Sequence, residues 1–435
     1  MTELYPYSDY KESGVDWIGA IPLHWGKAQL RRFVAIVNGG TPTPGPENWG
    51  GAVAWATPVD LNAVDGGVIE TTARTLTHQG LVSGSAAVPA RAVLLSTRAP
   101  IGYSAVTAGR MAFNQGCKGL VPRDELVADY LLFLVQAAKV ELVRRGQGTT
   151  FLELSTGALG STAVSIPPTS EQVVIAKFLD RETAEIDAFI ADQEELIGLL
   201  AERRAATISH AVTKGLDPTV PMKGSGVDWL GHVPATWRIL NARRVFAQRN
   251  EQGMADDVQL AASQEFGVIP QARYTELTGY RVTAVLKGFE ILKHVEPGDF
   301  VISMRSFQGG LEYSKHAGKI SSAYVMLTPQ LELNDEYFGY LFKSKGYISA
   351  LRATSNLVRD GQAMRFSNFA QVSIPVPPLE EQSRIAAALE TQTSDIDAMI
   401  TDAKKAIALS RERRAALISA AVTGKIDVRE HGAVA

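Results

Sequence analysis

The chain has 435 residues, of which 46% are hydrophobic, and it carries a net charge of -3 with its histidines neutral. A chain of this length exceeds what one ordinary hydrophobic core supports, so we expect two or more domains. The hydrophobic share excludes a disordered protein, and the charge is unusual for a protein that grips nucleic acid unaided. Either the chain does not bind nucleic acid, or a partner neutralises much of the phosphate charge while this chain contacts the bases.

The N-terminus has no basic region followed by an apolar stretch, so we expect no signal peptide. The longest apolar run, at residues 130–138, falls well short of the roughly 20 residues that span a bilayer. We therefore expect a cytoplasmic protein that does not contact a membrane. The single cysteine, Cys117, excludes an internal disulfide and has no Cys or His neighbour at metal-ligand spacing. We expect it to pack as a small apolar side chain.

The first element in chain order is a repeated frame. Residues 14–25, which begin Gly-Val-Asp-Trp and end in a second tryptophan, return at residues 226–237 after a shift of 212 positions. Residues 93–98 and 300–305 then each predict a buried strand that leads to a glycine, Gly102 or Gly309. We expect the four tryptophans of the frame to be core or partner-facing anchors rather than base-stacking platforms. Between these blocks the halves differ almost everywhere, so a duplicated frame holds two unlike inserts.

A long helix is predicted at residues 169–213. Thr169 and Gln172 fit a capping box at its start, and Gly215 stands just past its end, where helices commonly stop. Gly198 is a weak point inside it, because glycine costs about 1 kcal/mol relative to alanine in a helix. One apolar stripe runs along the helix at Ile175, Leu179, Ile186, Ile190, Gln193, Ile197 and Leu200.

A second long helix is predicted at residues 379–423. Its opening Pro-Pro-x-x-Glu-Gln repeats residues 167–172, and its Arg-Arg-Ala-Ala segment at 413–416 repeats residues 203–206 after a shift of 210 positions. Gly424 stands just past its end. Its apolar stripe consists of Ile385, Leu389, Ile396, Ile400, Ala403, Ile407, Leu417 and Ala421.

Each predicted helix of about 40 residues would be roughly 60 Å long, more than a compact domain can cover. We therefore expect the two helices to pair as an antiparallel coiled coil, although each stripe could instead pack on its own globular domain. Antiparallel pairing would place the two domains at opposite ends of a rod with a pseudo-twofold axis. The predicted fold class is α+β, with two globular α/β domains separated by two long antiparallel coiled-coil helices in a pseudo-twofold internal repeat.

This order of elements resembles the specificity subunit of Type I restriction-modification enzymes. The resemblance rests on residues 168–172 and 378–382, each leading into a matched helix, and it covers residues 14–427. It implies that the globular parts are target recognition domains. The expected boundaries are 1–168 for the first target recognition domain, 169–213 for the first spacer helix, 214–225 for a linker, 226–378 for the second target recognition domain, 379–423 for the second spacer helix and 424–435 for a C-terminal tail.

The resemblance implies a non-catalytic subunit that reads a bipartite, asymmetric site in double-stranded DNA. It also implies assembly with two methyltransferase (modification) subunits, which methylate adenine with S-adenosylmethionine, and with restriction subunits, which hydrolyse ATP and cut DNA. No cofactor is expected in this chain, because S-adenosylmethionine, ATP and Mg would be bound by those partners. The negative charge agrees with partners that close around the duplex.

From the residues alone, two other functions stay open: a coiled-coil adaptor whose inserts bind proteins instead of DNA, and a self-sufficient methyltransferase or nuclease. The sequence contains neither Asn-Pro-Pro-Phe nor Asp-Pro-Pro-Tyr, which hold a target amino group, and no phosphate-binding Gly-x-x-x-x-Gly-Lys-Ser/Thr. Its seven histidines form no local cluster. We therefore predict no catalytic residues and no metal site in this chain.

Candidate DNA-contacting residues are polar or basic side chains in loops that follow the strands of each insert. In the first insert they are Arg98, Asn114, Gln115, Lys118, Arg145, Gln147, Thr149 and Thr150. In the second insert they are Arg305, Ser306, Gln308, Tyr324, Arg359, Gln362 and Arg365. Arg98 and Arg305 hold matched positions after matched strands. For each residue the alternative is an ordinary solvated or ion-paired surface side chain.

Overall fold

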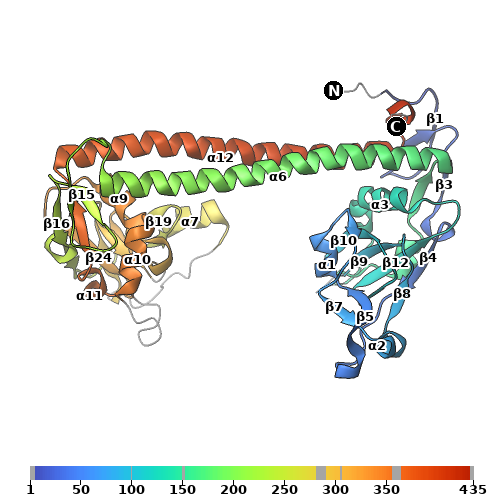
Figure 1. Ribbon diagram of the computed structural model, residues 1–435, viewed down its shortest axis with the longest axis horizontal. Helices are drawn as coiled ribbons and strands as arrows, with labels where there is room; N and C mark the ends of the chain where they lie inside the picture. Colours follow the sequence, from blue (N-terminus) through green and yellow to red (C-terminus); the bar gives the residue numbers. More distant parts are fainter. Residues whose placement is uncertain are drawn as a thin grey trace. The chain divides into compact units, whose positions relative to one another are not determined.

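The structure is a computed structural model that describes residues 5–98, 100–148, 152–280, 291–303, 306–354 and 364–431. The chain forms two compact units: unit 1 comprises Met1–Gln193 with Lys405–Ala435, and unit 2 comprises Glu194–Lys404. Each unit contains one globular domain and a part of each long helix, and the elements are labelled in Figure 1. No helix within the described ranges is long and apolar enough to cross a membrane.

The two long helices are α6 (Thr169–Lys214) and α12 (Leu379–Val422), and they run antiparallel (Figure 1). In unit 1, Arg414 Nε of α12 lies 2.9 Å from Asp187 Oδ1 of α6. In unit 2, Arg204 Nε of α6 lies 2.9 Å from Asp397 Oδ1 of α12. A shift of 210 positions relates the two ion pairs, so the same register repeats in both units. The predicted antiparallel pairing and internal repeat are confirmed.

The domain of unit 1, called the first domain, is built on two mixed sheets. One sheet has the order β4 (Val34–Asn38), β12 (Cys117–Pro122), β9 (Val93–Thr97), β10 (Ile101–Thr107), β6 (Val68–Ile69). The other has the order β7 (Arg74–Leu76), β5 (Trp49–Ala56), β11 (Met111–Phe113), β8 (Ala86–Val88). Short pairs are β1 (Tyr10–Glu12) with β2 (Ala20–Pro22), and β3 (Gly26–Gln29) with β13 (Ala163–Ile166). The helical elements are η1 (Leu30–Arg32), η2 (Pro46–Asn48), α1 (Pro58–Ala63), α2 (His78–Gly84), α3 (Ala128–Ala137), α4 (Lys139–Arg144) and α5 (Thr156–Gly160).

The domain of unit 2, called the second domain, repeats four strands of that first sheet. The order β17 (Phe246–Arg249), β24 (Val325–Pro329), β21 (Phe300–Ile302), β22 (Glu312–Tyr313) corresponds to β4, β12, β9, β10. The remaining strands pair as β14 (Met222–Gly224) with β15 (His232–Pro234), β16 (Arg238–Asn241) with β25 (Ser373–Val376), β18 (Leu260–Ser263) with β19 (Gly267–Pro270), and β20 (Lys293–Val295) with β23 (Gly318–Ile320). The helical elements are η3 (Ala242–Arg244), α7 (Gln271–Thr278), α8 (Ser306–Gly309), α9 (Asp335–Lys343), α10 (Lys345–Ala353) and α11 (Phe366–Phe369).

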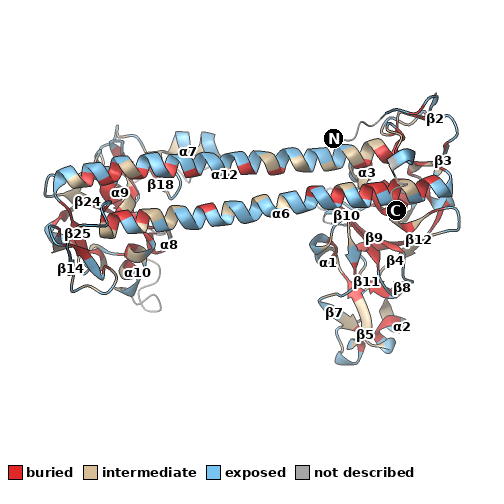
Figure 2. Cartoon of the chain, turned by 45° about the horizontal axis from the view of Figure 1, so that its top comes forward, coloured by how far each residue is buried: buried red, intermediate tan, exposed pale blue. Residues whose placement is uncertain are grey.

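The core of each domain takes side chains from both long helices. The first core contains Ile175 and Leu179 from the start of α6 together with Val422 from the end of α12. The second contains the equivalent positions, Ile385 and Leu389 from the start of α12 with Val212 from the end of α6. Figure 2 shows these buried helix ends, while most positions in the middle of both helices are exposed. Both expectations for the stripe therefore hold in part. The first turns of each helix pack on its own domain, its last turns pack in the core of the other domain, and its middle contacts the other helix, as in the Arg204–Asp397 ion pair.

The Pro-Pro-x-x-Glu-Gln motif fastens each long helix to its domain. The Gln172 side chain accepts a hydrogen bond from Val127 N at 2.9 Å and donates to Glu125 O at 2.9 Å and Pro167 O at 3.0 Å. The Gln382 side chain likewise accepts a hydrogen bond from Asn334 N and donates one to Pro377 O, each at 2.9 Å. The predicted capping box is wrong in this respect, because the Gln172 amide is engaged with the loop before α3 and with Pro167 instead of the backbone of Thr169.

The end of each long helix is closed by a buried tyrosine and a glycine. Tyr130 donates its hydroxyl to Val422 O at 3.3 Å, and Tyr337 donates to Val212 O at 3.0 Å. Gly215 and Gly424 follow with φ of 78° and 71°, a left-handed conformation that suits glycine. The two glycines therefore lie where the sequence predicts the helices to stop.

Both the expected linker and the expected C-terminal tail contain regular structure. The segment 214–225, expected to be a linker, begins with the last residue of α6 and includes β14, which pairs with β15. In the expected tail, Asp427 bridges Tyr5, and η5 (Arg429–His431) follows.

Trp25 and Trp237 are fully buried, as core anchors should be. Cys117 is also buried, and burial raises the pKa of its thiol to about 12, which agrees with an apolar packing role.

Replacing two glycines of the long helices with alanine should change the stability of the protein in opposite directions. Gly424→Ala should destabilise the protein by about 1–2 kcal/mol, because an L-residue is strained in the left-handed region. Its new Cβ would also lie 2.3 Å from Pro22 Cδ. Gly198→Ala is the matched control, since Gly198 lies exposed inside α6 and a Cβ added there would meet nothing within 4 Å, and it should stabilise by about 1 kcal/mol. Thermal unfolding of both variants tests this, and shifts of the same sign would contradict it.

Candidate nucleic-acid interface

Several predicted residues of the first domain converge where three neighbouring strands meet. β12 pairs with both β4 and β9, so that Lys118 lies opposite Asn38 on one side and Leu95 on the other. Arg98 directly follows β9 and bridges Glu153, which also bridges Gln147. The end of β9, the start of β12 and the end of β4 thus form one edge of the sheet, and Glu153 and Leu154 lie beside the end of β9.

Two of these candidates have structural roles at this edge. Lys118 is only 7% exposed and donates its Nζ to Asn38 Oδ1 at 2.9 Å, and burial lowers its pKa. Thr156 Oγ1 donates to the same Asn38 oxygen at 2.7 Å. Asn114 Oδ1 accepts from Gly116 N at 3.0 Å and so shapes the turn between β11 and β12. Lys118 and Asn114 therefore support the edge more than they face outward from it.

Arg145 is also engaged within the protein. Its Nε lies 2.5 Å from Glu141 Oε1, and its Nη1 donates to Ser161 Oγ at 3.4 Å. Glu141 is buried, and its pKa is lowered by hydrogen bonds from Arg144 and Arg145. Because a buried carboxylate needs such partners, Arg145 serves the packing of α4.

The outward-facing candidates of the first domain are Arg98, Gln115 and Gln147, all exposed. Thr41 Oγ1 donates to the side-chain oxygen of Gln115. We call Thr41, Arg98, Gln115 and Gln147 the domain 1 edge. Thr149 and Thr150 lie outside the described residues. Sequence reasoning missed Thr41, although a signal was available in the two glycines before it.

Those glycines bring the loop close to its neighbours. A Cβ on Gly39 would lie 2.0 Å from Asn114 O, and one on Gly40 would lie 2.3 Å from Gly84 O. Only glycine permits such an approach of two backbones, which places Thr41 beside Gln115.

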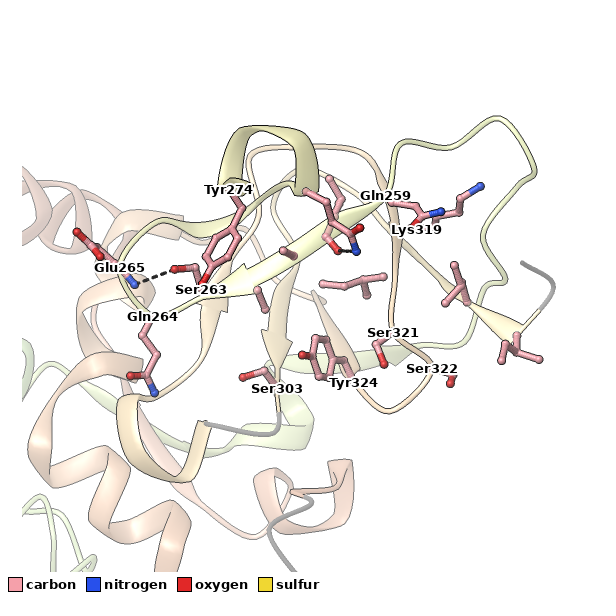
Figure 3. Close-up of a pocket in the computed structure, with 17 residues that line it drawn as sticks. Gln259, Ser263, Gln264, Glu265, Tyr274, Ser303, Lys319, Ser321, Ser322 and Tyr324 are labelled. Carbon is pink, nitrogen blue, oxygen red and sulfur yellow. Dashed lines mark hydrogen bonds between the residues drawn. The ribbon is translucent and has the colours of Figure 1, made fainter. Parts of the chain in front are cut away.

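The equivalent place in the second domain is a polar groove. There β24 pairs with β17 and β21, and Ser303 follows β21 while Tyr324 precedes β24. The turn after β18, the helix α7 and the strand β23 add further walls, and together they enclose a cavity of about 750 Å³ (Figure 3). We call this cavity the domain 2 groove; amide, hydroxyl and phenol side chains line it, among them Gln259, Ser263, Gln264, Gln271, Tyr274, Ser303 and Tyr324.

The candidates of the second domain divide in a similar way. Tyr324 is half-buried and lines the groove, and Gln308 is exposed on α8. Ser306 is buried, and its Oγ accepts a hydrogen bond from Ser303 N at 2.8 Å, so its side chain supports the fold. Arg365 is exposed at the start of α11 and does not line the groove. Arg305, Arg359 and Gln362 lie outside the described residues.

Cations near the groove are held by the protein itself. Lys319 Nζ donates to Met254 O at 3.0 Å and Ala255 O at 2.8 Å, and Lys293 Nζ donates to Tyr324 O at 2.6 Å. Arg249 forms an ion pair with the buried Asp299 at 2.8 Å. Apart from Glu265 and Lys319, the polar residues in the described lining of the groove are neutral hydrogen-bonding groups, which suit contacts to base edges better than contacts to phosphates. Within the described ranges no group of three or more His, Cys, Asp or Glu residues could hold a metal ion.

His294 braces the loop that holds Lys319. Its Nδ1 lies 3.0 Å from Asp257 Oδ2, and its Nε2 lies 2.7 Å from Glu296 Oε1. Burial lowers the pKa of His294, but the hydrogen bonds to Glu296 and Asp257 outweigh burial, and the pKa is raised overall. The imidazolium is favoured because each ring nitrogen can then donate to a carboxylate.

His294 predicts a pH-dependent stability. A raised folded-state pKa contributes stability that is fully present below the unfolded value of about 6.5 and is lost as the pH rises through the folded value. His294→Gln should cost about 1.5–3 kcal/mol in mildly acidic solution and less in alkaline solution. Unfolding of both proteins between pH 5.5 and 9 measures this, and a cost that does not change with pH would refute it.

Comparisons with known proteins place these features in context. The family model described as Type I restriction modification DNA specificity domain matches residues 22–196 and 267–408. The Type I restriction enzyme MjaIX specificity subunit of Methanocaldococcus jannaschii is 32% identical over 176 residues, which are 40% of this chain and 40% of that protein. The putative type I restriction enzyme MjaX specificity subunit of the same organism is 23% identical over 269 residues, 61% of this chain and 60% of that protein. The chain thus spans less than two thirds of the length of either relative.

A solved structure extends the likeness of fold to nearly the whole chain. A chain from a study of complex assembly and conformational transition of the type I R-M system matches 92% of this chain and 98% of its own length. The TM-score is 0.64 at 17% sequence identity, so the shared feature is the fold.

Proposed function

The chain belongs to the family of the Type I restriction modification DNA specificity domain, and we therefore propose that it is the DNA-sequence-reading subunit of a Type I restriction-modification complex. Residues 1–168 and 226–378 are its two target recognition domains, and each reads one half of a bipartite, asymmetric site in double-stranded DNA. The residues between and after them form the spacer helices 169–213 and 379–423. The family match also argues against the coiled-coil adaptor.

One observation supports the proposal of a bipartite, asymmetric site: corresponding strand ends of the two matched sheets carry different side chains. Apart from the matched pair Arg98 and Arg305, the domain 1 edge offers the hydroxyl of Thr41 and the amides of Gln115 and Gln147. The domain 2 groove offers two phenols, Tyr274 and Tyr324, beside amides and hydroxyls such as Gln264 and Ser303. Because different donor and acceptor sets match different base pairs in the major groove, the two domains read different half-sites.

The long helices set the distance between the half-sites. At 1.5 Å per residue, the 46 residues of α6 extend roughly 70 Å, comparable to about two turns of duplex DNA. Residues in the middle of the helices contact the other helix and not a globular core, as the Arg204–Asp397 ion pair illustrates. Helix length therefore determines the unread gap.

Partners supply the chemistry and much of the phosphate neutralisation. The net charge of -3 is insufficient for a protein that binds DNA alone. In unit 1 the long helices expose Phe189 and Leu409, and in unit 2 they expose Met399 and Leu199, which are the same positions shifted by 210 residues. Repeated apolar residues of this kind fit two copies of one partner, the modification subunit. S-adenosylmethionine binds to that partner, ATP and Mg bind to the restriction subunits, and this chain is non-catalytic.

Binding to duplex DNA, with and without the co-expressed modification subunit, tests the proposal. We expect sequence-specific binding by the complex, with the logarithm of affinity falling linearly with the logarithm of salt concentration, and weak binding by the chain alone. We also expect no methyl transfer by the purified chain. Absence of any sequence preference in both preparations would rule the proposal out, and a salt-independent interaction would point to a protein adaptor.

A lengthened spacer tests the role of the helices. An insertion of about four residues, one helical turn, after Glu195 and after Lys405 lengthens both helices by roughly 6 Å and leaves the residues of each unit's ion pair, Arg204–Asp397 and Arg414–Asp187, unchanged. We expect an unread gap longer by roughly two base pairs, with both half-site sequences unchanged. Methylome sequencing of a host carrying the complete system measures both quantities. An insertion in only one helix is the control and should impair assembly, whereas a changed half-site in the double insertion would contradict the spacer role of the helices.

A further inference from the structure

Gln264 lies in a turn of fixed shape at the wall of the domain 2 groove. The turn joins β18 to β19, and Ser263 Oγ accepts hydrogen bonds from Glu265 N and Phe266 N, each at 3.3 Å. Figure 3 shows the Gln264 side chain extending from this turn, with Ser303 and Tyr324 lining the same cavity. The backbone of Gln264 is thus held in place from its own side of the groove.

An ion pair between the exposed Lys343 and the buried Glu312 also holds the turn. Lys343 Nζ donates to Gln264 O at 2.7 Å and lies 2.8 Å from Glu312 Oε2. Glu312 is 1% exposed, and burial raises its pKa while Lys343 opposes that shift. Since a buried carboxylate requires a nearby cation, Lys343 has little freedom to move, and α9 and β22 together fix the position of Gln264.

Gly309 provides the space that the Gln264 side chain occupies. A Cβ on Gly309 would lie 2.4 Å from both Cδ and Nε2 of Gln264. The matched glycine of the first domain, Gly102, faces Lys139 instead, whose Cγ would lie 2.7 Å from a Cβ there. The repeated glycine therefore leaves room for a different side chain in each domain, and in the second domain that side chain is an amide on the wall of a groove.

We infer that Gln264 is a specificity-determining residue that reads an adenine, in an A·T pair, in the half-site contacted by the second domain. The inference rests on the proposed function. A carboxamide presents one donor and one acceptor in a plane, which match N7 and the N6 amino group of adenine in the major groove. Guanine is read mainly by arginine or lysine, and among the described residues the two lysines next to this groove, Lys319 and Lys293, are bonded to protein groups.

Two variants test the role of Gln264 by independent routes. Gln264→Ala removes the amide, and Gly309→Ala displaces it while leaving the glutamine in the sequence. In the complex with its modification subunits, both should relax the preference at the same single A·T position of one half-site, by about ten- to a hundredfold in relative affinity. The other half-site and the gap should be unchanged. Gln330→Ala is the matched control, because Gln330 is an exposed glutamine beyond the opposite end of β24 from Tyr324.

The readout is binding to a duplex library by the purified complex, combined with methylome sequencing, and thermal unfolding confirms that each variant is folded. If Gln264→Ala retains the wild-type preference at every position, or relaxes a G·C position, the inference is wrong while the proposed function stands. If the wild-type complex shows no bipartite preference, the proposed function itself fails. If Gly309→Ala unfolds the domain, Gln264→Ala alone decides the matter.

Discussion

Each domain core is completed by the end of the helix that belongs to the other copy of the repeat. Val422, from the second copy, packs in the first core and its carbonyl accepts the hydroxyl of Tyr130; Val212 and Tyr337 do the same in the second. Burial raises the pKa of both tyrosine hydroxyls, so they remain protonated donors. Fully burying one such aliphatic side chain stabilises a protein by about 1.5–3 kcal/mol. If either helix end left a domain, the core of that domain would be exposed to solvent. The ends of both long helices are therefore integral parts of the two domain cores.

This arrangement separates the scaffold from the specificity. The residues that join helix to domain recur in both halves: Gln172 and Gln382 fasten the first helical turn, and Trp25 and Trp237 fill the core. Apart from the matched arginines Arg98 and Arg305, the described residues at the sheet edges differ, since the first domain presents Gln115 and Gln147 where the second presents a groove that Tyr274 and Tyr324 line. A change at an edge can alter what is read without altering how the helices are held.

Electrostatics agrees with the proposal that this weakly acidic chain contacts DNA with the help of partners. Several basic residues that look free in the sequence are engaged with the protein, including Lys118 with Asn38, Arg145 with Glu141 and Lys319 with two carbonyls. Because these groups satisfy buried polar partners, they add little to the attraction for phosphates. The surfaces that remain are suited to hydrogen bonds with base edges, and under the proposed function such contacts would specify a sequence while other subunits hold the backbone.

The sequence by itself determined the repeat, the two long helices and the stops at Gly215 and Gly424, because helical periodicity, capping preference and self-similarity are local properties of the chain. It also located Arg98, Gln115 and Tyr324 near strand ends. Only the tertiary structure decided which polar residues support the fold: strand pairing places Lys118 opposite Asn38, and packing buries Glu141, so that its local i,i+4 partner Arg145 is needed to neutralise it. The domain 2 groove likewise required the folded chain, since Gln264, Gly309 and Lys343 come together only through packing between separate elements.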